Sequence, residues 1–568
     1  MIYTPRIGVL IVLTFVGVTA TAAQDRRTIL SNAVVYEGAA QSQPFVARRL
    51  TPNLLGRKSL SAQWNPGDPI AEIPKRIKVR RLLQPSPPAR AKTSLIDPLV
   101  DKQQRRVALF RAEESFGKPK IFADQPFPGA NPPDTVGDVG SGHYVHMTNG
   151  RTGAILRIYD KVTGNLEAGP VELAELAKER PVGELDDCKK GAGDPVVLYD
   201  ELAKRWLLSE FSDIADKMCV YISQADDPTT TEWFGYEFAG KLGFPDYPKF
   251  AVWPSAYFVA SNESKPTVYA FDRKAMLAGQ PASYLSFSAQ DLESFGFQAL
   301  QPADVDGAQG PPVGSPGYFL RHRDDEVHNP ASNQPKTDLL ELFEFHPDFS
   351  DASKSTFTGP IQIPISEIDS DLCGLRSISC FKQPRRTGTN FAPSPALDPL
   401  REVVMWRVQY RVFPSHESMV GSLVTDVNRR DRGGIRWFEL RRSAGQPVWQ
   451  LHQEGTFSLN SDTHNRFMPS IAMDKVGNIA LGYSIVGEKL SAGIRYTGRR
   501  FSDPKGIMSL GEFILADGQG ISESNRWGDY SSLNVDPVDG CTFWYTNQFA
   551  DNGLYQTRVG TFRFANCL

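Results

Sequence analysis

The sequence predicts an all-β chain, a seven-bladed β-propeller with an N-terminal extended arm. The first observation is a motif that recurs seven times, with a polar or Pro/Gly lead-in, about five alternating apolar residues, a tight turn and a second apolar run, which is the pattern of an antiparallel hairpin. The second observation is the spacing of the copies, between 52 and 88 residues, which leaves room for a four-stranded unit and its loops. The copies begin at Asp134, Asp194, Asp246, Asp304, Ala392, Met468 and Asp529.

Residues 1–23 are typical of a secretory signal peptide. Arg6 precedes an apolar run over residues 7–18, and small residues lead to Ala23. A basic start, a short apolar run and small residues at the exit predict export with cleavage near Ala23. The run is too short for a membrane span, and no later segment approaches twenty apolar residues, so we expect no transmembrane segment and a secreted or periplasmic location.

Residues 24–104 are predicted to form a basic, proline-containing extended arm without sustained periodicity. Residues 24–110 hold 16 Lys/Arg against 6 Asp/Glu, a balance of +10, and the whole chain carries −3. With +1 from Arg6, residues 111–568 carry −14. We interpret the arm as a solvated linker or a removable pro-segment. Two alternatives are that it lies on the acidic body or anchors to an anionic cell surface, whereas nucleic acid is disfavoured as a partner of an exported protein.

The predicted propeller covers residues 105–568. The second blade is predicted at 195–199, 204–211, 218–223 and 233–239, and the sixth has strands at 469–473 and 478–484. The fifth blade contains one strand too many, around 416–425 or 435–441, which the pattern does not assign. The last blade shows three strands, and because exposed sheet edges are a liability, we expect a strand from about 105–123 to supply the fourth and close the propeller.

Six cysteines agree with an oxidising compartment. We predict pairing between neighbours, although six cysteines allow fifteen connectivities. The predicted disulfides are Cys188–Cys219, Cys373–Cys380 and Cys541–Cys567. No Cys-x-x-Cys motif occurs, which disfavours thiol redox chemistry, structural zinc and covalent haem, so we expect no cofactor.

Calcium is the alternative to a protein without cofactors. Asp304-Val-Asp306-Gly resembles the start of a calcium loop, and these two aspartates are the candidate metal ligands. No Glu stands at the twelfth position, which excludes an EF-hand.

The candidate ligand site is the face where the first strands of the blades begin. In a ring of blades these starts converge at one mouth of the central channel, where carboxylates gather on blades one to four and Asn and Arg on blades five to seven. Arginine offers a planar, bidentate fork for carboxylate, sulfate or phosphate. The candidate ligand-binding residues are Arg411, Arg466, Arg526, Asp194, Asp246 and Asp529. Two structural alternatives stay open: the aspartates cap backbone N–H groups, and the arginines form ion pairs between blades.

Four long strings carry a resemblance to a known family. They are residues 143–149, 470–484, 494–499 and 526–546, the last reading Arg526-Trp-Gly-Asp-Tyr-Ser-Ser and then Val535-Asp-Pro-Val-Asp-Gly-Cys-Thr-Phe-Trp-Tyr-Thr546. These strings resemble a family of secreted, mostly bacterial, β-propeller-like proteins, over roughly residues 125–568. The resemblance implies the fold and export, and it implies no activity.

The layout is also similar to that of sialidases, which use three arginines on a carboxylate, a Tyr–Glu nucleophile pair and an Asp acid/base. This similarity implies binding roles for Arg411, Arg466 and Arg526 and catalytic roles for Tyr530, Glu417 and Asp138. The sequence departs from the sialidase pattern because the Phe-Arg-Ile-Pro motif is missing and Asp539-Gly-Cys-Thr-Phe-Trp lacks one spacer residue.

Two functions follow from these observations. The first is a secreted β-propeller that binds an extracellular ligand, glycan or protein, through its Asp/Arg-rich channel face. The alternative is a sialidase-like glycoside hydrolase or lyase that acts on anionic glycans, with two carboxylates as acid and base. The sequence leaves open whether the protein is an enzyme, and it does not set the oligomeric state.

Overall fold

The computed structural model describes residues 33–568 except 74–96, 108–115, 293–297, 329–336, 376, 387–392, 444–445 and 447. In this part of the chain the protein is all-β, as the sequence predicts, and its helices are short. The helices and 3-10 turns are α3 (Pro98–Val107), α4 (Glu175–Lys178), α5 (Arg273–Leu277), η1 (Leu60–Ala62), η3 (Asp186–Cys188), η4 (Ala352–Lys354) and η5 (Cys373–Leu375). The predicted signal peptide lies outside the described residues.

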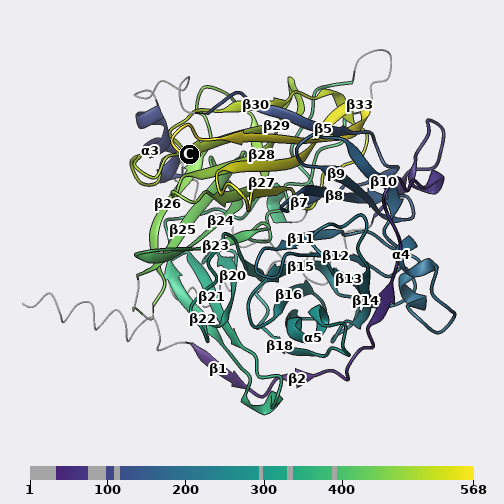
Figure 1. Cartoon of the computed structure of the whole chain (residues 1–568). Helices are drawn as coiled ribbons and strands as arrows, with labels where there is room; N and C mark the ends of the chain where they lie inside the picture. Colours follow the sequence, from purple (N-terminus) through teal and green to yellow (C-terminus); the bar gives the residue numbers. More distant parts are fainter. Residues whose placement is uncertain are drawn as a thin grey trace, which may run out of the picture.

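Six antiparallel sets of four strands follow one another along the chain (Figure 1). The first two sets are β7 (Val136–Val139), β8 (His143–Gly150), β9 (Gly153–Asp160), β10 (Leu166–Glu172), and β11 (Val196–Asp200), β12 (Arg205–Phe211), β13 (Lys217–Ser223), β14 (Trp233–Ala239). The third and fourth are β15 (Asp246–Val252), β16 (Tyr257–Asn262), β17 (Pro266–Phe271), β18 (Tyr284–Ser288), and β19 (Gln301–Val305), β20 (Gly317–Arg323), β21 (Leu339–His346), β22 (Thr356–Pro364). The fifth and sixth are β23 (Val408–Phe413), β24 (His416–Asp426), β25 (Gly433–Ser443), β26 (Gln450–Phe457), and β27 (Asn465–Met473), β28 (Ile479–Gly487), β29 (Leu490–Arg499), β30 (Phe513–Ala516).

The last sheet joins the C-terminal strands to a strand from early in the chain. β32 (Ser532–Val535) pairs with the start of β33 (Thr542–Arg563), and β5 (Lys120–Gln125) pairs with residues Thr557–Thr561 of β33. β31 (Gln519–Ser522) pairs in parallel with β33. The segment expected to contribute a fourth strand therefore contains the beginning of β5, which runs beside β33 in Figure 1.

The first strands of the six sets and β32 of the last sheet contact one another in chain order. β7 contacts β11, which contacts β15, and the series continues through β19, β23 and β27 to β32, which contacts β7. β19 and β23 also pair directly, in parallel. Asp134, Asp194, Asp246 and Asp529, at the starts of four of these strands, lie near one another, whereas Asp138 and Asp304, near the ends of β7 and β19, meet at Arg407.

Four short strands of the N-terminal arm pair with other strands of the described chain. β1 (Val34–Glu37) extends the fourth sheet beside β22, β2 (Ala40–Gln41) extends the third beside β18, and β3 (Arg48–Leu50) extends the second beside β14. These arm strands satisfy N–H and C=O groups at outer strand edges that would otherwise lack partners. Residues 33–73 therefore do not form a solvated linker, and they lie against the body as in one of the alternatives given above. β4 (Ala71–Glu72) then pairs in parallel with β6 (Ala130–Asn131).

Helix α3 occupies part of the segment where the sequence analysis expects extended chain. Pro98 stands at its first position, where a missing N–H costs nothing, and the Asp97 carboxylate accepts the N–H of Leu99 at 2.9 Å. α3 contacts β26, and the Gln103 side chain donates to the Met508 carbonyl at 2.7 Å. A ten-residue helix held by such distant partners leaves only a weak local signal.

The predicted strand positions agree closely with the second sheet and fail in the fifth. In the sixth they overlap β27 and β28, but β27 begins four residues earlier and β28 ends three residues later than predicted. In the second sheet each predicted strand overlaps its observed counterpart to within one residue at either end. In the fifth, the motif starting at Ala392 does not form the first strand, which is β23 instead. Pro393, Pro395 and Pro399 cannot donate ladder hydrogen bonds, which accounts for the failure. The strand that the pattern could not assign is thereby explained, because β24 and β25 are both regular members of this sheet.

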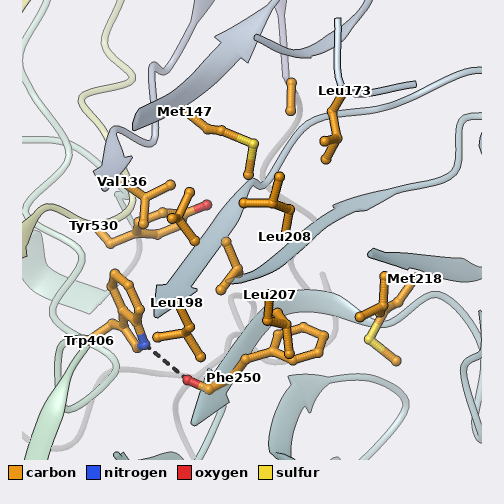
Figure 2. Close-up of a cluster of buried hydrophobic side chains, with 14 of the residues drawn as sticks. Val136, Met147, Leu173, Leu198, Leu207, Leu208, Met218, Phe250, Trp406 and Tyr530 are labelled. Atoms are coloured by element: carbon orange, nitrogen blue, oxygen red, sulfur yellow. Dashed lines mark hydrogen bonds between the residues drawn. The ribbon is translucent and has the colours of Figure 1, made fainter. Parts of the chain in front are cut away.

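The largest hydrophobic cluster lies where the first sheets meet the loop before β23 (Figure 2). Trp406 is fully buried there, and its indole N–H donates to the Phe250 carbonyl at 3.3 Å. The Trp406 ring also meets Tyr530 edge-on, with centroids 6.1 Å apart. This contact connects the core to the candidate site described below.

All three predicted disulfides are present. Cys188–Cys219, Cys373–Cys380 and Cys541–Cys567 close loops of 31, 7 and 26 residues, and the predicted pairing is confirmed. Among the described residues no helix is long and apolar enough to cross a membrane.

Candidate functional site

The backbone is unusual where the first strands begin. Four residues at or near the starts of first strands have a positive φ, between 44° and 52°, a backbone conformation that residues other than glycine rarely adopt. These residues are Asp134, Asp194, Tyr247 and Met468. Strained backbone that recurs at one end of a fold often marks a functional site.

Asp134 is a structural carboxylate. It is fully buried, one of its oxygens accepts the backbone N–H of Asp529 at 2.6 Å, and the other accepts the Asn149 side-chain amide at 3.0 Å. Burial raises the pKa of Asp134 well above its ordinary value, and the nearby Asp529 and Asp194 raise it further. The capping role that the sequence left open for the aspartates applies to this residue.

Asp194 differs from Asp134. It is 5 % exposed and lines a cavity, and its carboxylate accepts no hydrogen bond from the residues that the structure describes. Burial raises the pKa of Asp194 to about 7, with Asp246 and Asp529 raising it and Lys249 opposing the shift. This carboxyl therefore keeps its proton to a higher pH than an ordinary aspartate does, and it lines the cavity.

Lys249 lies beside Asp194 in an aromatic clamp. Its ammonium is 3.6 Å from the ring centroid of Tyr247 and 3.9 Å from that of Tyr530, which is cation–π geometry. Both phenols donate to backbone carbonyls, that of Tyr247 to Asp529 at 3.2 Å and that of Tyr530 to Pro195 at 2.7 Å. Burial lowers the pKa of Lys249 to about 8, against the pull of the surrounding carboxylates.

Arg526 is the cation that reaches the cavity from the loop before β32. Its Nη2 donates to both carboxylate oxygens of Asp529, at 2.9 and 3.0 Å, and its Nη1 donates to the Ile73 carbonyl at 2.6 Å. Its Nε has no hydrogen-bond acceptor within the described part of the chain. One N–H of a 7 % exposed guanidinium is thus left without a partner among the described residues.

The cavity has a volume of about 750 Å³, within the range of small-ligand sites. It is formed by the first three sheets, the loop before β32 and the N-terminal arm. Its walls combine carboxylates, cations and an aromatic pair, Phe211 and Phe244, whose ring centroids are 4.6 Å apart. The charged lining residues are Glu72, Arg151, Glu172, Lys178, Lys189, Lys190, Asp194, Asp213, Asp246, Arg526 and Asp529.

Four of the six predicted ligand residues therefore meet at one cavity, namely Asp194, Asp246, Arg526 and Asp529. The predicted catalytic candidate Tyr530 lies behind them, with its phenol committed to Pro195.

Arg466 and Glu417 lie elsewhere. Arg466 is fully buried and pairs with Asp462 and Glu512, each at 2.8 Å, as expected of a structural ion pair. Glu417 binds the Arg442 guanidinium and accepts from the Tyr410 phenol.

A second charged cluster lies at the opposite end of the first strands. Arg407 is 3.0 Å from Asp304, 3.1 Å from Asp306 and 3.7 Å from Asp138, and Arg411 is 3.3 Å from Asp306. Asp138 and Asp304 also accept the backbone N–H groups of Tyr199 and Val252. Arg411 lies in β23, the first strand of its set. The candidate metal ligands Asp304 and Asp306 thus bind an arginine in this structure.

Four other carboxylates of the described chain lie close enough together to hold a metal ion. Their oxygens lie within 4.8 Å of one another, and the residues are Asp324, Asp325, Glu326 and Asp338. Two of them cap backbone: Asp324 accepts from Glu326, Val327 and Ser370, and Asp338 accepts from Asp325 and Ile368. This group was not predicted from the sequence. Its members lie on both sides of residues 329–336 and so do not form one short motif.

Several cavity residues carried no signal that the sequence analysis used. The pair Lys189-Lys190, between Cys188 and Gly191, could have been noticed as a basic step beside a predicted disulfide. Glu72 and Ile73 of the arm and the Phe211–Phe244 pair become neighbours of Asp194 only through the fold.

No protein-family model matches the sequence, and no curated protein matches it. Among solved structures, a polysaccharide lyase of family PL25 described as an ulvan lyase has a TM-score of 0.36 at 10 % identity, covering 77 % of this chain and 94 % of its own. An α-L-arabinanase from Penicillium chrysogenum gives a TM-score of 0.26 at 11 % identity, covering 66 % and 96 %. An α-L-arabinofuranosidase from Podospora anserina gives 0.24 at 11 % identity, covering 57 % and 91 %. Similarities this low carry no conclusion about this chain.

Proposed function

We propose that the seven sheets are the blades of a seven-bladed β-propeller and that the protein is secreted. The contacts of the seven first strands, from β7 round to β32 and back to β7, support the blade arrangement. The three disulfides support an oxidising compartment outside the cytoplasm. Membership of the family of secreted, mostly bacterial, β-propeller-like proteins remains part of this proposal.

We propose further that the protein binds an extracellular anionic glycan in the cavity at the starts of the first strands. The observation that carries this function is that one cavity is lined both by the Asp194 carboxylate, which accepts no hydrogen bond from the described residues, and by Arg526, whose buried Nε–H has no acceptor among them. Buried polar groups normally find partners, so a carboxylate and an arginine with unused hydrogen-bonding capacity beside one cavity favour a polar, charged ligand there. A sugar acid would offer a hydroxyl to Asp194 and a carboxylate or sulfate to Arg526.

The remaining walls fit the same ligand class. The Phe211–Phe244 pair offers an apolar surface on which the C–H face of a pyranose can pack. Arg151, Lys178 and the Lys189-Lys190 pair add positive charge at the rim, which favours an anionic chain over a neutral one.

One observation favours the enzyme alternative, a hydrolase or lyase acting at the same site. The pKa of about 7 for Asp194 is the value that suits a general acid or base near neutral pH. Asp246 and Asp529 line the same cavity and supply the second carboxylate that glycosidic cleavage needs.

The test is binding and turnover on a panel of tetragalacturonate, a heparin tetrasaccharide and sialyllactose. Asp194→Asn and Arg526→Lys should lose binding while Arg466→Lys, whose partners lie outside the cavity, should keep it. Release of reducing sugar or of an unsaturated product, abolished by Asp194→Asn, would establish the enzyme alternative. Equal binding by all four proteins would refute the site, and a pull-down from cell surfaces would then test a protein ligand.

A further inference from the structure

The N-terminal arm contributes a wall to the cavity at residues 71–73. The Ala71 N–H donates to the Gly129 carbonyl at 2.9 Å, and the Ile73 N–H donates to the Asn131 carbonyl at 2.7 Å. Glu72 lies between them and accepts the Asn131 side-chain amide at 2.7 Å and the Ser524 hydroxyl at 3.1 Å. A segment far from β32 in the sequence is thus seated beside the residues that precede this strand.

This segment accepts a hydrogen bond from Arg526 that an anionic ligand would otherwise accept. The Ile73 carbonyl accepts from Nη1 of Arg526 at 2.6 Å, which places a neutral oxygen where a sugar carboxylate would bind. The Ile73 side chain also packs on Gly193, where an added Cβ would lie 3.0 Å from Ile73 Cδ1. Gly193 directly precedes Asp194, so the arm touches both sides of the candidate site.

The anchorage of this segment is slight. β4 is two residues long and has one two-residue parallel partner, β6. Glu72 is exposed, and Ala71 and Ile73 are only half-buried, so little apolar surface holds the segment down. By contrast β3, at the second sheet, ends on the buried Leu50 and pairs over three residues.

We propose that residues 71–73 are a displaceable occupant of the cavity, supplied by the chain itself, which a glycan must move aside in order to bind Nη1 of Arg526. This inference rests on the proposed binding function and adds its regulation. Occupancy by the arm lowers the apparent affinity in proportion to the fraction of molecules in which the arm is seated. A carbonyl that competes with a charged ligand oxygen also selects for anions, because a neutral sugar gains little by replacing it.

Two variants move the arm in opposite directions. Ala71→Cys/Ala130→Cys joins residues that face each other in the β4–β6 register and locks the arm when oxidised. Glu72→Ala/Ile73→Gly removes the two side-chain hydrogen bonds of Glu72 and the contact of Ile73 with Gly193, and loosens the arm. Peptide mapping confirms the new disulfide beside the three native ones.

Binding of tetragalacturonate and of a heparin tetrasaccharide is measured by calorimetry for the wild type and both variants. The oxidised lock should weaken binding about tenfold or more and recover on mild reduction, which should leave the wild type unchanged, and the loosened variant should bind about fivefold tighter. Equal dissociation constants for all three proteins would overturn the inference and leave the proposed function standing. Absence of binding by all three would overturn both.

Hydrogen exchange measured without any glycan tests the displaceable arm independently of the proposed binding function. The Ala71 and Ile73 amides should exchange much faster than the amides of β8, because a displaceable segment opens without global unfolding. Exchange of these amides only at the rate of β8 would show that the arm is a fixed wall and would overturn the inference by itself.

Discussion

The Arg526 guanidinium is held by Asp529 through one nitrogen, Nη2, which donates to both carboxylate oxygens at 2.9 and 3.0 Å. A pair three residues apart in one loop fixes the plane of the guanidinium before any ligand arrives. The remaining nitrogens are then directed elsewhere, Nη1 to the Ile73 carbonyl and Nε to no acceptor among the described residues. Arg526 is therefore oriented by its neighbour and still has hydrogen-bonding capacity for a ligand.

Arg526→Lys should separate these two roles. Lysine keeps the charge but loses the planar fork, so we expect binding of an anionic oligosaccharide to weaken by about 1–3 kcal/mol. Calorimetry on the purified variant measures this loss, and thermal unfolding measures the cost of the weaker contact with Asp529. A lowered melting temperature with unchanged affinity would make Arg526 a structural residue only.

Arg466→Lys is the matched control. This variant likewise loses a guanidinium that binds carboxylates. Its two partners, Asp462 and Glu512, lie outside the cavity lining. Its melting temperature should fall while its affinity stays at the wild-type value.

Asp194→Asn should stabilise the protein in a pH-dependent way. The folded pKa of about 7 lies above the ordinary value of 3.8, so the folded protein holds a proton that the unfolded chain releases across this window. Wild-type stability therefore falls as pH rises from about 4 to 7, and the amide, which has no charge to desolvate, avoids that loss. We expect a gain of about 1–3 kcal/mol at pH 8, reduced by the loss of a partner for Lys249, and almost none at pH 4.

Urea unfolding at pH 4 and pH 8 provides the measurement. Asp216→Asn, at an exposed position, controls for the removal of one negative charge. A gain that is the same at both pH values would contradict the raised pKa of Asp194.

The repeated hairpins were predictable because their signal is local. In the second sheet the alternation of apolar residues and the turn chemistry sufficed to locate β11 to β14 to within one residue at each end. The fifth sheet failed because the motif at Ala392 matches the apolar pattern while its prolines disqualify it as a ladder strand. The pairing of β1, β2 and β3 with outer strands was invisible because it depends on edges hundreds of residues away.

The candidate site was predictable only in part for a related reason. Asp134 and Asp194 occupy equivalent points of the repeat, yet one caps Asp529 and the other faces the cavity. Asp304 was grouped with them, but it lies near the end of β19 and contacts Arg407 there, away from the cavity. A shift of a few residues along a strand changes the end of the assembly that a side chain reaches, and composition does not record that shift.

Asp97→Ala should release helix α3. The Asp97 carboxylate caps the helix at Leu99 and binds the buried Arg436 at 3.0 Å and the Thr456 hydroxyl at 2.8 Å. Removing one partner of a buried ion pair typically costs about 3–5 kcal/mol. Urea unfolding should show this loss, and hydrogen exchange should show faster exchange of the α3 amides. A loss below about 1 kcal/mol would mean that Glu454, which also contacts Arg436, suffices as its partner.

Removal of the Cys188–Cys219 disulfide should cost both stability and binding. Cys188 ends η3, directly before Lys189, Lys190 and Gly191 of the cavity wall, and Cys219 lies in the middle of β13. The double substitution Cys188→Ala/Cys219→Ala should lower the free energy of unfolding by about 3–4 kcal/mol and leave this wall less ordered, so that affinity for an anionic oligosaccharide falls as well.

Cys541→Ala/Cys567→Ala is the matched control, because its loop of 26 residues is close to the 31 of the first disulfide and neither cysteine lines the cavity. Similar losses of stability but a loss of affinity only in the first variant would connect this disulfide to the site. Equal affinities in both variants would mean that the Lys189-Lys190 wall contributes nothing to ligand binding.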